Sequence, residues 1–185
     1  MSDLGHVCVH PFQSASPGSP KSYSKQEVTM YQRILVPLDG SKLAEQAIPY
    51  AAELCKGATE VTLFQVVHLP LPLVAPDASM AVPMPDPKQL LQDALDYLNG
   101  IAEKLREEGV RVVTDAVERN AVAEALVEYA QEHDIDLIVM TTHGRSGLSR
   151  LIFGSVAESV VRHAPCPVLL VRAELVEEHV EKSGS

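Results

Sequence analysis

Short apolar runs alternate with amphipathic segments along most of the chain, and this alternation predicts the fold. Each run is rich in Val, Ile and Leu and is bounded by turn-forming residues, as is typical of strands buried within a parallel sheet. Such runs predict strands at residues 34–38, 61–67, 110–117, 135–140 and 168–171.

The segments between these runs carry apolar residues at every third or fourth position, the spacing of one buried helix face. Asp86 followed by Pro87 favours a helix start, and Gln89 completes a cap-like pattern. Asn120 is expected to cap the following helix, and Gly57 to end the first one. The predicted helices cover residues 41–56, a segment from Pro87 to just before Gly109, a segment carrying Val122 to Ala130, and residues 156–163.

Alternating strands and helices imply right-handed crossovers and a parallel sheet covered by helices on both faces. The expected fold class is therefore α/β, a single domain built on an open twisted parallel five-stranded sheet. In such sheets a ligand binds beyond the carboxyl ends of the strands, where the strand order reverses. Asp39 and the segment 141–147 would meet there if the first and fourth strands are neighbours.

Composition and charge narrow the function classes. The chain has 185 residues, 46% of them hydrophobic, which is enough for one domain with a substantial core. A net charge of −10 disfavours a general nucleic-acid partner. No apolar run approaches the length of a membrane span and no secretory signal is evident, so we expect a cytoplasmic protein without a membrane partner. Three cysteines do not suggest a disulfide framework, and no metal-ligand cluster stands out in the folded region.

Residues 140–155 combine the end of a buried strand, a glycine-bearing loop and the start of a helix. Glycines let backbone N–H groups approach an anion, and a helix N-terminus adds free donors and partial positive charge. Gly144 and Gly154 bracket nine residues, and Ser155 follows at once. Arg145 and Arg150 could neutralise a bound phosphate. The layout therefore predicts an anion site.

This spacing resembles the nucleotide-binding branch of the universal stress protein family, whose motif is Gly-x-x-Gly, nine residues, then Gly-Ser or Gly-Thr. Here the first motif glycine is replaced by Thr141. The stretch 33–41 resembles the family's opening strand and acidic turn, and 164–172 resembles its closing strand. The resemblance covers roughly residues 30–173, and the ordered set of three is more specific than any one piece.

The resemblance implies a Rossmann-like sheet of order 3-2-1-4-5 that binds ATP, or AMP or ADP, with Mg²⁺ bridging the phosphates. It also implies a homodimer formed through the strand Val168–Arg172. Val66 matches the position whose backbone meets the adenine edge, and Asp39 the family's acidic residue at the adenosine. The nucleotide contacts implied are Pro37, Asp39, Val66, Thr141, Gly144, Arg145, Gly147, Gly154 and Ser155.

Each of these residues also has a plain structural alternative. Asp39 could form a turn and cap the next helix. The glycines Gly144 and Gly154 could serve turn geometry alone, rather than donate N–H groups to phosphate. Ser155 begins Ser-Val-Ala-Glu, a capping box. Thr141 would be strained if its position required a positive φ.

The flanking segments are expected to lie outside the domain of residues 30–173. Residues 1–29, rich in Ser, Pro and Gly, predict a disordered N-terminal extension, and residues 174–185 an acidic tail. Met30 stands where family members commonly begin, so we expect the native start at Met30 or a dispensable extension. The many prolines of segment 69–87 predict an extended loop.

The functional hypothesis is a nucleotide-dependent stress-response switch. A second hypothesis is a nucleotide-independent dimeric interaction module. A third, an enzyme using the same fold, is disfavoured because the P-loop, Gly-x-Gly-x-x-Gly and Gly-x-Ser-x-Gly motifs are absent. His143 is more readily explained as a loop-anchoring residue than as a catalytic one. Because no general base is evident, any ATP hydrolysis should be slow.

Overall fold

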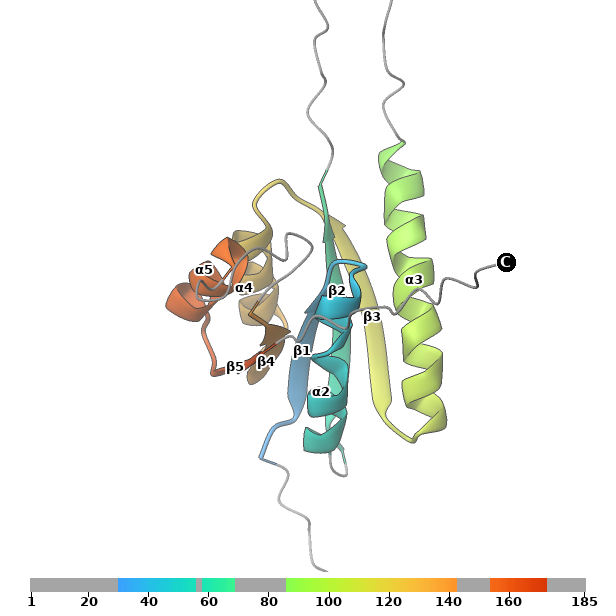
Figure 1. Ribbon diagram of the computed structural model, residues 1–185, viewed down its shortest axis with the longest axis vertical. Helices are drawn as coiled ribbons and strands as arrows, with labels where there is room; N and C mark the ends of the chain where they lie inside the picture. Colours follow the sequence, from blue (N-terminus) through green and yellow to red (C-terminus); the bar gives the residue numbers. More distant parts are fainter. Residues whose placement is uncertain (1–29, 56–57, 69–85, 143–153, 173–185) are drawn as a thin grey trace, which may run out of the picture.

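The computed structural model describes residues 30–55, 58–68, 86–142 and 154–172. Its strands form one five-stranded parallel sheet in the order β3-β2-β1-β4-β5, which confirms the predicted fold class (Figure 1). The elements in chain order are β1 (Arg33–Leu38), α1 (Lys42–Glu45), α2 (Ile48–Leu54), β2 (Glu60–Val67), α3 (Pro87–Glu107), β3 (Arg111–Glu118), α4 (Val122–Glu132), β4 (Leu137–Thr141), α5 (Ser155–His163) and β5 (Val168–Val171).

Helices cover both faces of the sheet and divide the core into two clusters. On one face α1, α2 and α3 pack, and on the other α4 and α5 (Figure 1). Side chains along β1 alternate between the faces, because Ile34 and Val36 join the first cluster and Leu35 the second. All five residues of β4 are buried. Burial on both faces explains why β1 and β4 read as continuous apolar runs.

The predicted helix at 41–56 is interrupted, so this prediction is wrong in one detail. Two short helices, α1 and α2, occupy the segment, and Pro49 is the second residue of α2. Proline has no N–H to donate to the carbonyl of Glu45, and its ring would clash with that carbonyl. The Ser41 side chain caps α1 by accepting from the Ala44 N–H at 3.2 Å. Gly57, the predicted C-cap, lies outside the described residues.

Of the other two predicted helix caps, one is confirmed and one is wrong. The Asp86 carboxylate accepts from the Lys88 N–H at 3.0 Å, which confirms Asp86 as the cap of α3. The Gln89 side chain does not complete that cap, since it donates to Asp93 at 2.7 Å along the helix surface. The prediction for Asn120 is wrong, because the N-cap of α4 is the following residue, an alanine without a side-chain capping bond.

The predicted extension 1–29, most of the proline-rich segment 69–87 and the acidic tail 174–185 lie outside the described residues. Those three predictions stay untested. Within the described ranges, no helix is long and apolar enough to cross a membrane.

Candidate functional site

The strands β1 and β4 separate toward their carboxyl ends. β1 pairs with β2 along its whole length, from Arg33 to Leu38. It pairs with β4 only at Ile34 and Leu35, although β4 continues to Thr141 beside β5. Strand order reverses between β1 and β4, and this reversal is where open parallel sheets bind ligands. The gap therefore opens at the place that the sequence predicted.

A proline is tolerated at position 37 of β1 because its backbone nitrogen faces this gap. The Arg33 carbonyl accepts from the Asp136 N–H at 3.0 Å, on the β4 side of β1. Backbone groups of alternate residues point the same way along a strand, so the Pro37 nitrogen also faces β4. It lies beyond the last β1–β4 pair, where a missing N–H removes no ladder hydrogen bond.

The turn after β1 is built around Asp39. Its Oδ1 accepts from the Ser41 N–H at 3.0 Å and from the Ser41 hydroxyl at 2.6 Å. Gly40 between them has a φ of 82°, a conformation that glycine adopts without strain. Asp39 thus forms the turn, as the structural alternative predicted, whereas the helix cap itself is Ser41.

Two adjoining hollows lie over this end of the sheet. The larger is a cleft of about 680 Å³ between the ends of β1 and β2 and the N-terminal half of α3. The smaller hollow, of about 120 Å³, lies between the end of β4 and the start of α5. Their shared lining residues are Pro37, Leu38, Asp39, Val122, Leu126 and Val156. Together they offer a site with one end on β2 and the other on α5.

The backbone of Val66 presents an acceptor to the larger cleft. Glu60 donates its N–H to Gln32 on the β1 side of β2, and the Val67 carbonyl accepts from Arg119 on the β3 side. Alternation therefore turns the Val66 carbonyl toward β1, past the final β1–β2 pair. No backbone N–H among the described residues donates to this carbonyl. The geometry leaves it available to a ligand.

The N-terminus of α5 presents donors to the smaller hollow. The first N–H with a partner inside the helix is that of Glu158, which donates to the Gly154 carbonyl at 2.9 Å. The N–H groups of Ser155, Val156 and Ala157 precede it and have no acceptor within the helix. Val156 and Ala157 line the smaller hollow, and Ser155 comes just before them, so the donors and the positive end of the helix dipole lie at the edge of this hollow.

Two expectations for this helix start are wrong. Ser155 does not form a capping box, because it is the first helical residue and the Glu158 N–H bonds to Gly154 instead. Nor does Gly154 offer its own N–H to an anion, since it donates to the Thr142 carbonyl at 2.8 Å. Donors at this helix start are instead the N–H groups of the residues after Gly154. Gly154 itself has a φ of −57°, which any residue can adopt.

Thr141 is accommodated without backbone strain. It ends β4, is 6% exposed and pairs with Val171. Among the described non-glycine residues only Asp134 has a positive φ. The hollow of about 120 Å³ remains beside Thr141, so its side chain lines the hollow rather than filling it.

A profile of the universal stress protein family matches residues 30–172. The chain belongs to the universal stress protein family. A universal stress protein of Methanocaldococcus jannaschii is 36% identical over 145 residues, which cover 77% of this chain and 83% of that protein.

Solved structures of the family share the fold. One from Lactobacillus plantarum has a TM-score of 0.61 at 25% identity and covers 77% of this chain and 98% of its own. Another universal stress protein, solved in complex with cAMP, has a TM-score of 0.57 at 22% identity and covers 78% of this chain and 98% of its own. At that identity the likeness shows the fold alone. That relative itself binds cAMP, which is an adenine nucleotide.

The remaining site predictions for this universal stress protein fall outside the described residues: Gly144, Arg145 and Gly147, together with His143 and Arg150. They stay predictions. Of the others, Pro37, Asp39 and Val66 line the larger cleft, and Thr141 and Gly154 the smaller hollow.

The sequence interpretation missed the wall of the cleft that α3 and the end of β2 supply. Asp93 and Tyr97 of α3 line it together with Gln65 and His68 of β2 and its end. Gln65 had a visible signal, since it is a polar residue within a predicted buried strand. The contribution of α3 had none, because nothing local in the sequence shows which part of a helix overhangs the sheet.

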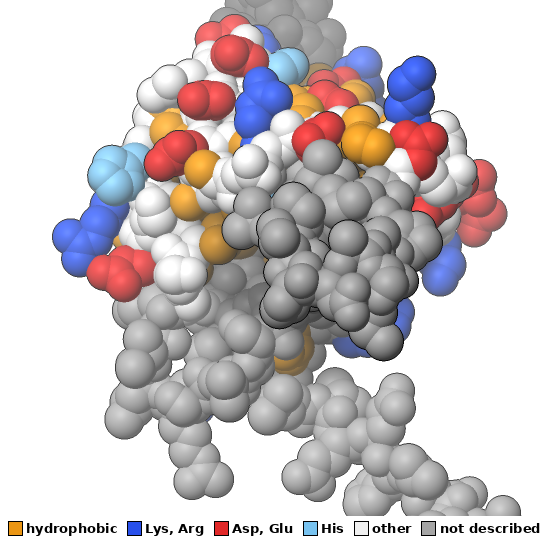
Figure 2. Space-filling model, turned by 90° about the horizontal axis from the view of Figure 1, so that it is seen from above, with side chains coloured by type: hydrophobic (Ala, Val, Ile, Leu, Met, Phe, Trp, Pro, Cys, Tyr) orange, Lys and Arg blue, Asp and Glu red, His pale blue; other side chains and the backbone are white. Residues whose placement is uncertain are grey.

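The surface at this end of the sheet carries both signs of charge. Figure 2 looks onto the carboxyl ends of the strands, and acidic and basic side chains alternate over the described part of that surface. The described lining of the larger cleft contains the carboxylates Asp39 and Asp93 but no lysine or arginine. Within the described ranges, no cluster of three His, Cys, Asp or Glu side chains could hold a metal ion.

Neither described cysteine thiol is activated. Burial raises the pKa of the Cys55 and Cys166 thiols above the ordinary value, so both are held in the protonated form at neutral pH. Neither thiol lines the cleft or the smaller hollow. The two thiols therefore supply no reactive group to the described site.

Proposed function

We propose that this universal stress protein binds an adenine nucleotide, ATP or its relatives AMP and ADP, across the two adjoining hollows. The observation that carries the proposal is the combination of donors at the start of α5, which have no acceptor within that helix, with the Val66 carbonyl, to which no described backbone N–H donates. These opposite kinds of backbone group lie at the two ends of one site.

The phosphates belong at α5 in this proposal. The N–H groups of Ser155, Val156 and Ala157 can each donate to a phosphate oxygen, and the helix dipole favours negative charge there. Gly144, Arg145 and Gly147 would complete the phosphate site from the preceding loop.

The base belongs in the larger cleft. Its described lining carries carboxylates and no lysine or arginine, which disfavours a phosphate. The adenine amino group is a donor that suits the Val66 carbonyl. Pro37 and Val122 supply apolar surface for the flat ring system, and Asp39 lies where the ribose would pass between the hollows.

Mg²⁺ would enter with the nucleotide rather than occupy a site of its own. It typically binds through substrate phosphates, a few waters and one or two protein oxygens, so a preformed cluster of carboxylates is not required. Its role would be to neutralise the phosphate charge beside α5. With no activated nucleophile among the described residues, we propose that binding serves as a switch and that hydrolysis is slow.

Calorimetric titration of the purified full chain with ATP tests the proposal, with and without Mg²⁺. We expect saturable binding with one nucleotide per chain. A mass spectrum of small molecules released on denaturation checks for nucleotide that co-purifies. Absence of both bound nucleotide and a titration signal would refute the proposal.

We also propose that two copies of the chain pair through β5. Among the described strands, β5 is at the edge of the sheet and pairs on one side only, with β4. Leu169 within it is 37% exposed, so its apolar side chain is available to a covered interface. Such a dimer also serves the second candidate function, an interaction module that needs no nucleotide.

Leu169→Lys is expected to shift the chain from dimer to monomer, because a charge in an apolar strand interface opposes pairing. Sedimentation equilibrium measures the change. The exposed Val113 of β3, at the opposite edge, provides the control, and Val113→Lys should leave the dimer intact. A wild-type monomer, or a dimer unaffected by Leu169→Lys, contradicts the proposed interface.

A further inference from the structure

Gln65 contains a buried polar atom that the fold itself does not explain. Its Oε1 is buried and has no hydrogen-bond partner among the described residues. Buried acceptors are nearly always paired, because an unpaired one has lost its water without compensation. An unpaired acceptor beside a cleft indicates a group that a ligand can satisfy.

The side chain of Gln65 lies on the α3 face of the sheet. Val61 and Leu63 join the core cluster on that face, and side chains alternate along a strand, so Gln65 follows them. There it lines the larger cleft together with Asp93 and Tyr97. The unpaired oxygen therefore belongs to the wall that α3 forms.

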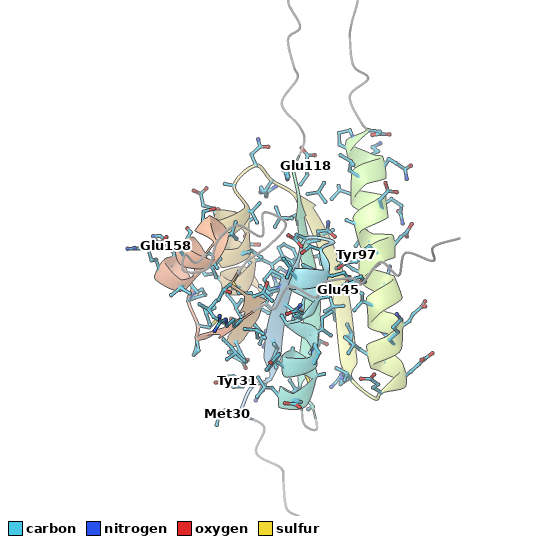
Figure 3. The ribbon with its side chains drawn as sticks, in the orientation of Figure 1. Met30, Tyr31, Glu45, Tyr97, Glu118 and Glu158 are labelled. Carbon is cyan, nitrogen blue, oxygen red and sulfur yellow. The ribbon has the colours of Figure 1, made fainter. Side chains whose placement is uncertain are left out.

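The neighbouring polar groups on this wall already have partners. The Tyr97 hydroxyl donates to Glu45 at 3.2 Å, and the two side chains point toward each other between α3 and α1 (Figure 3). Glu45 in turn accepts from Lys42 at 2.8 Å. Asp93 accepts from Gln89 at 2.7 Å. Gln65 is thus the lining residue on this wall whose acceptor has no partner among the described groups.

We propose that Gln65 is a specificity-determining residue, whose carboxamide oxygen accepts a hydrogen bond from the exocyclic amino group of a purine base. The oxygen reaches the cleft by rotation of the side chain, which breaks no hydrogen bond in the described structure. An amino group has two hydrogens, and the Val66 carbonyl and Gln65 are two acceptors next to each other in the chain. This inference rests on the proposed nucleotide site.

A base with an oxo group at the same position fits this pair poorly. The oxo oxygen is an acceptor and would face the Val66 carbonyl, which cannot become a donor, in a cleft that also carries Asp39 and Asp93. Gln65 could pair with it only by turning its carboxamide over to present the NH2 group. A site built to bind a donor rejects an analogue that lacks it, because its own polar groups then stay unpaired. The cleft should therefore prefer amino-purines to oxo-purines.

The test compares ATP with inosine triphosphate, in which an oxo group replaces the amino group, by calorimetric titration of the full chain. Gln65→Met keeps the length of the side chain and removes the carboxamide, and Gln65→Leu is a second variant. The preference for ATP is expected to fall by about 3-fold to 10-fold in both, mainly through weaker ATP binding. The control Gln92→Met removes an exposed glutamine that bonds to Asp96 along α3, and should leave the preference unchanged.

Stability provides an independent measurement. Without nucleotide, Gln65→Met should melt at the wild-type temperature or above, because it removes an unpaired buried acceptor at little change in volume. A clearly lower melting temperature in both variants would show that the carboxamide has a structural partner, and would overturn the inference.

The two proposals fail separately. If wild-type protein binds ATP and the variants keep its preference over inosine triphosphate, the role of Gln65 is refuted and the nucleotide site stands. If wild-type protein binds neither nucleotide, both proposals fall.

Discussion

Ser155→Pro is a precise perturbation of the proposed phosphate site. Proline removes one of the three N–H groups at the start of α5 that have no acceptor within the helix, and leaves the other two. The first helical position is the one at which proline is best tolerated, since its N–H has no partner within the helix. The preceding Gly154 has φ −57° and ψ 147°, the extended conformation that a residue before proline prefers. The substitution should therefore fold normally.

The magnitude follows from the hydrogen bond that is lost. A bond from an N–H group to a charged phosphate oxygen contributes about 1.5–3 kcal/mol, so ATP should bind roughly 10-fold to 100-fold more weakly. Ser155→Ala is the matched control, because it removes the hydroxyl and keeps the N–H. Its ATP affinity should stay within about 3-fold of wild type.

Calorimetric titration measures both affinities, and thermal unfolding without nucleotide checks that the two variants are equally stable. Equal ATP affinity in the proline and alanine variants would refute the donor role of this N–H group. An alanine variant that weakens binding as much as proline would show that the Ser155 hydroxyl makes the contact instead.

The remaining predictions concern glycines and the glycine replacement in the motif. Gly40→Ala should lower the free energy of unfolding by about 1 kcal/mol, because Gly40 has a φ of 82°. Gly100→Ala should raise the free energy of unfolding by about 0.5–1 kcal/mol, because Gly100 is in α3 and a Cβ added there would meet open space. Urea denaturation measures the free energy of unfolding of both variants, and equal changes in the two would contradict the prediction. Thr141→Gly should destabilise β4 by about 1 kcal/mol and leave ATP affinity within about 3-fold of wild type, because the hollow is already open. A 10-fold gain in affinity would instead show that Thr141 obstructs the site.

The sequence predicted helices and strands well where a single pattern of apolar residues was clear. Continuous apolar runs identified β1 and β4 because these strands are buried on both faces. The strand order came from the family resemblance. The break between α1 and α2 was missed, although Pro49 was visible, because the apolar spacing continues across it.

Site residues could be predicted where a short stretch of sequence and the strand order identify them. The gap between β1 and β4 followed from strand order, and Pro37, Asp39 and Thr141 lie at it. The assignment of donors at α5 was wrong because a hydrogen bond between Gly154 and Thr142 depends on how two elements dock. The same limit hid Gln65, whose missing partner is a property of the packed cleft and of no short segment.

The backbone of Thr142 connects the start of α5 with the end of β5. Thr142 accepts from Gly154 at the start of α5, and donates its own N–H to Val171 at the end of β5 at 3.0 Å. The helix α5, at which we propose that phosphate binds, and the edge strand β5 are thus hydrogen-bonded to the same residue. If nucleotide binding at α5 and pairing of two copies through β5 both change the position of Thr142, the two events are coupled. Nucleotide must then change the affinity of the two copies for each other by the same factor as pairing changes the affinity for nucleotide. The extent of pairing would then depend on the nucleotide concentration.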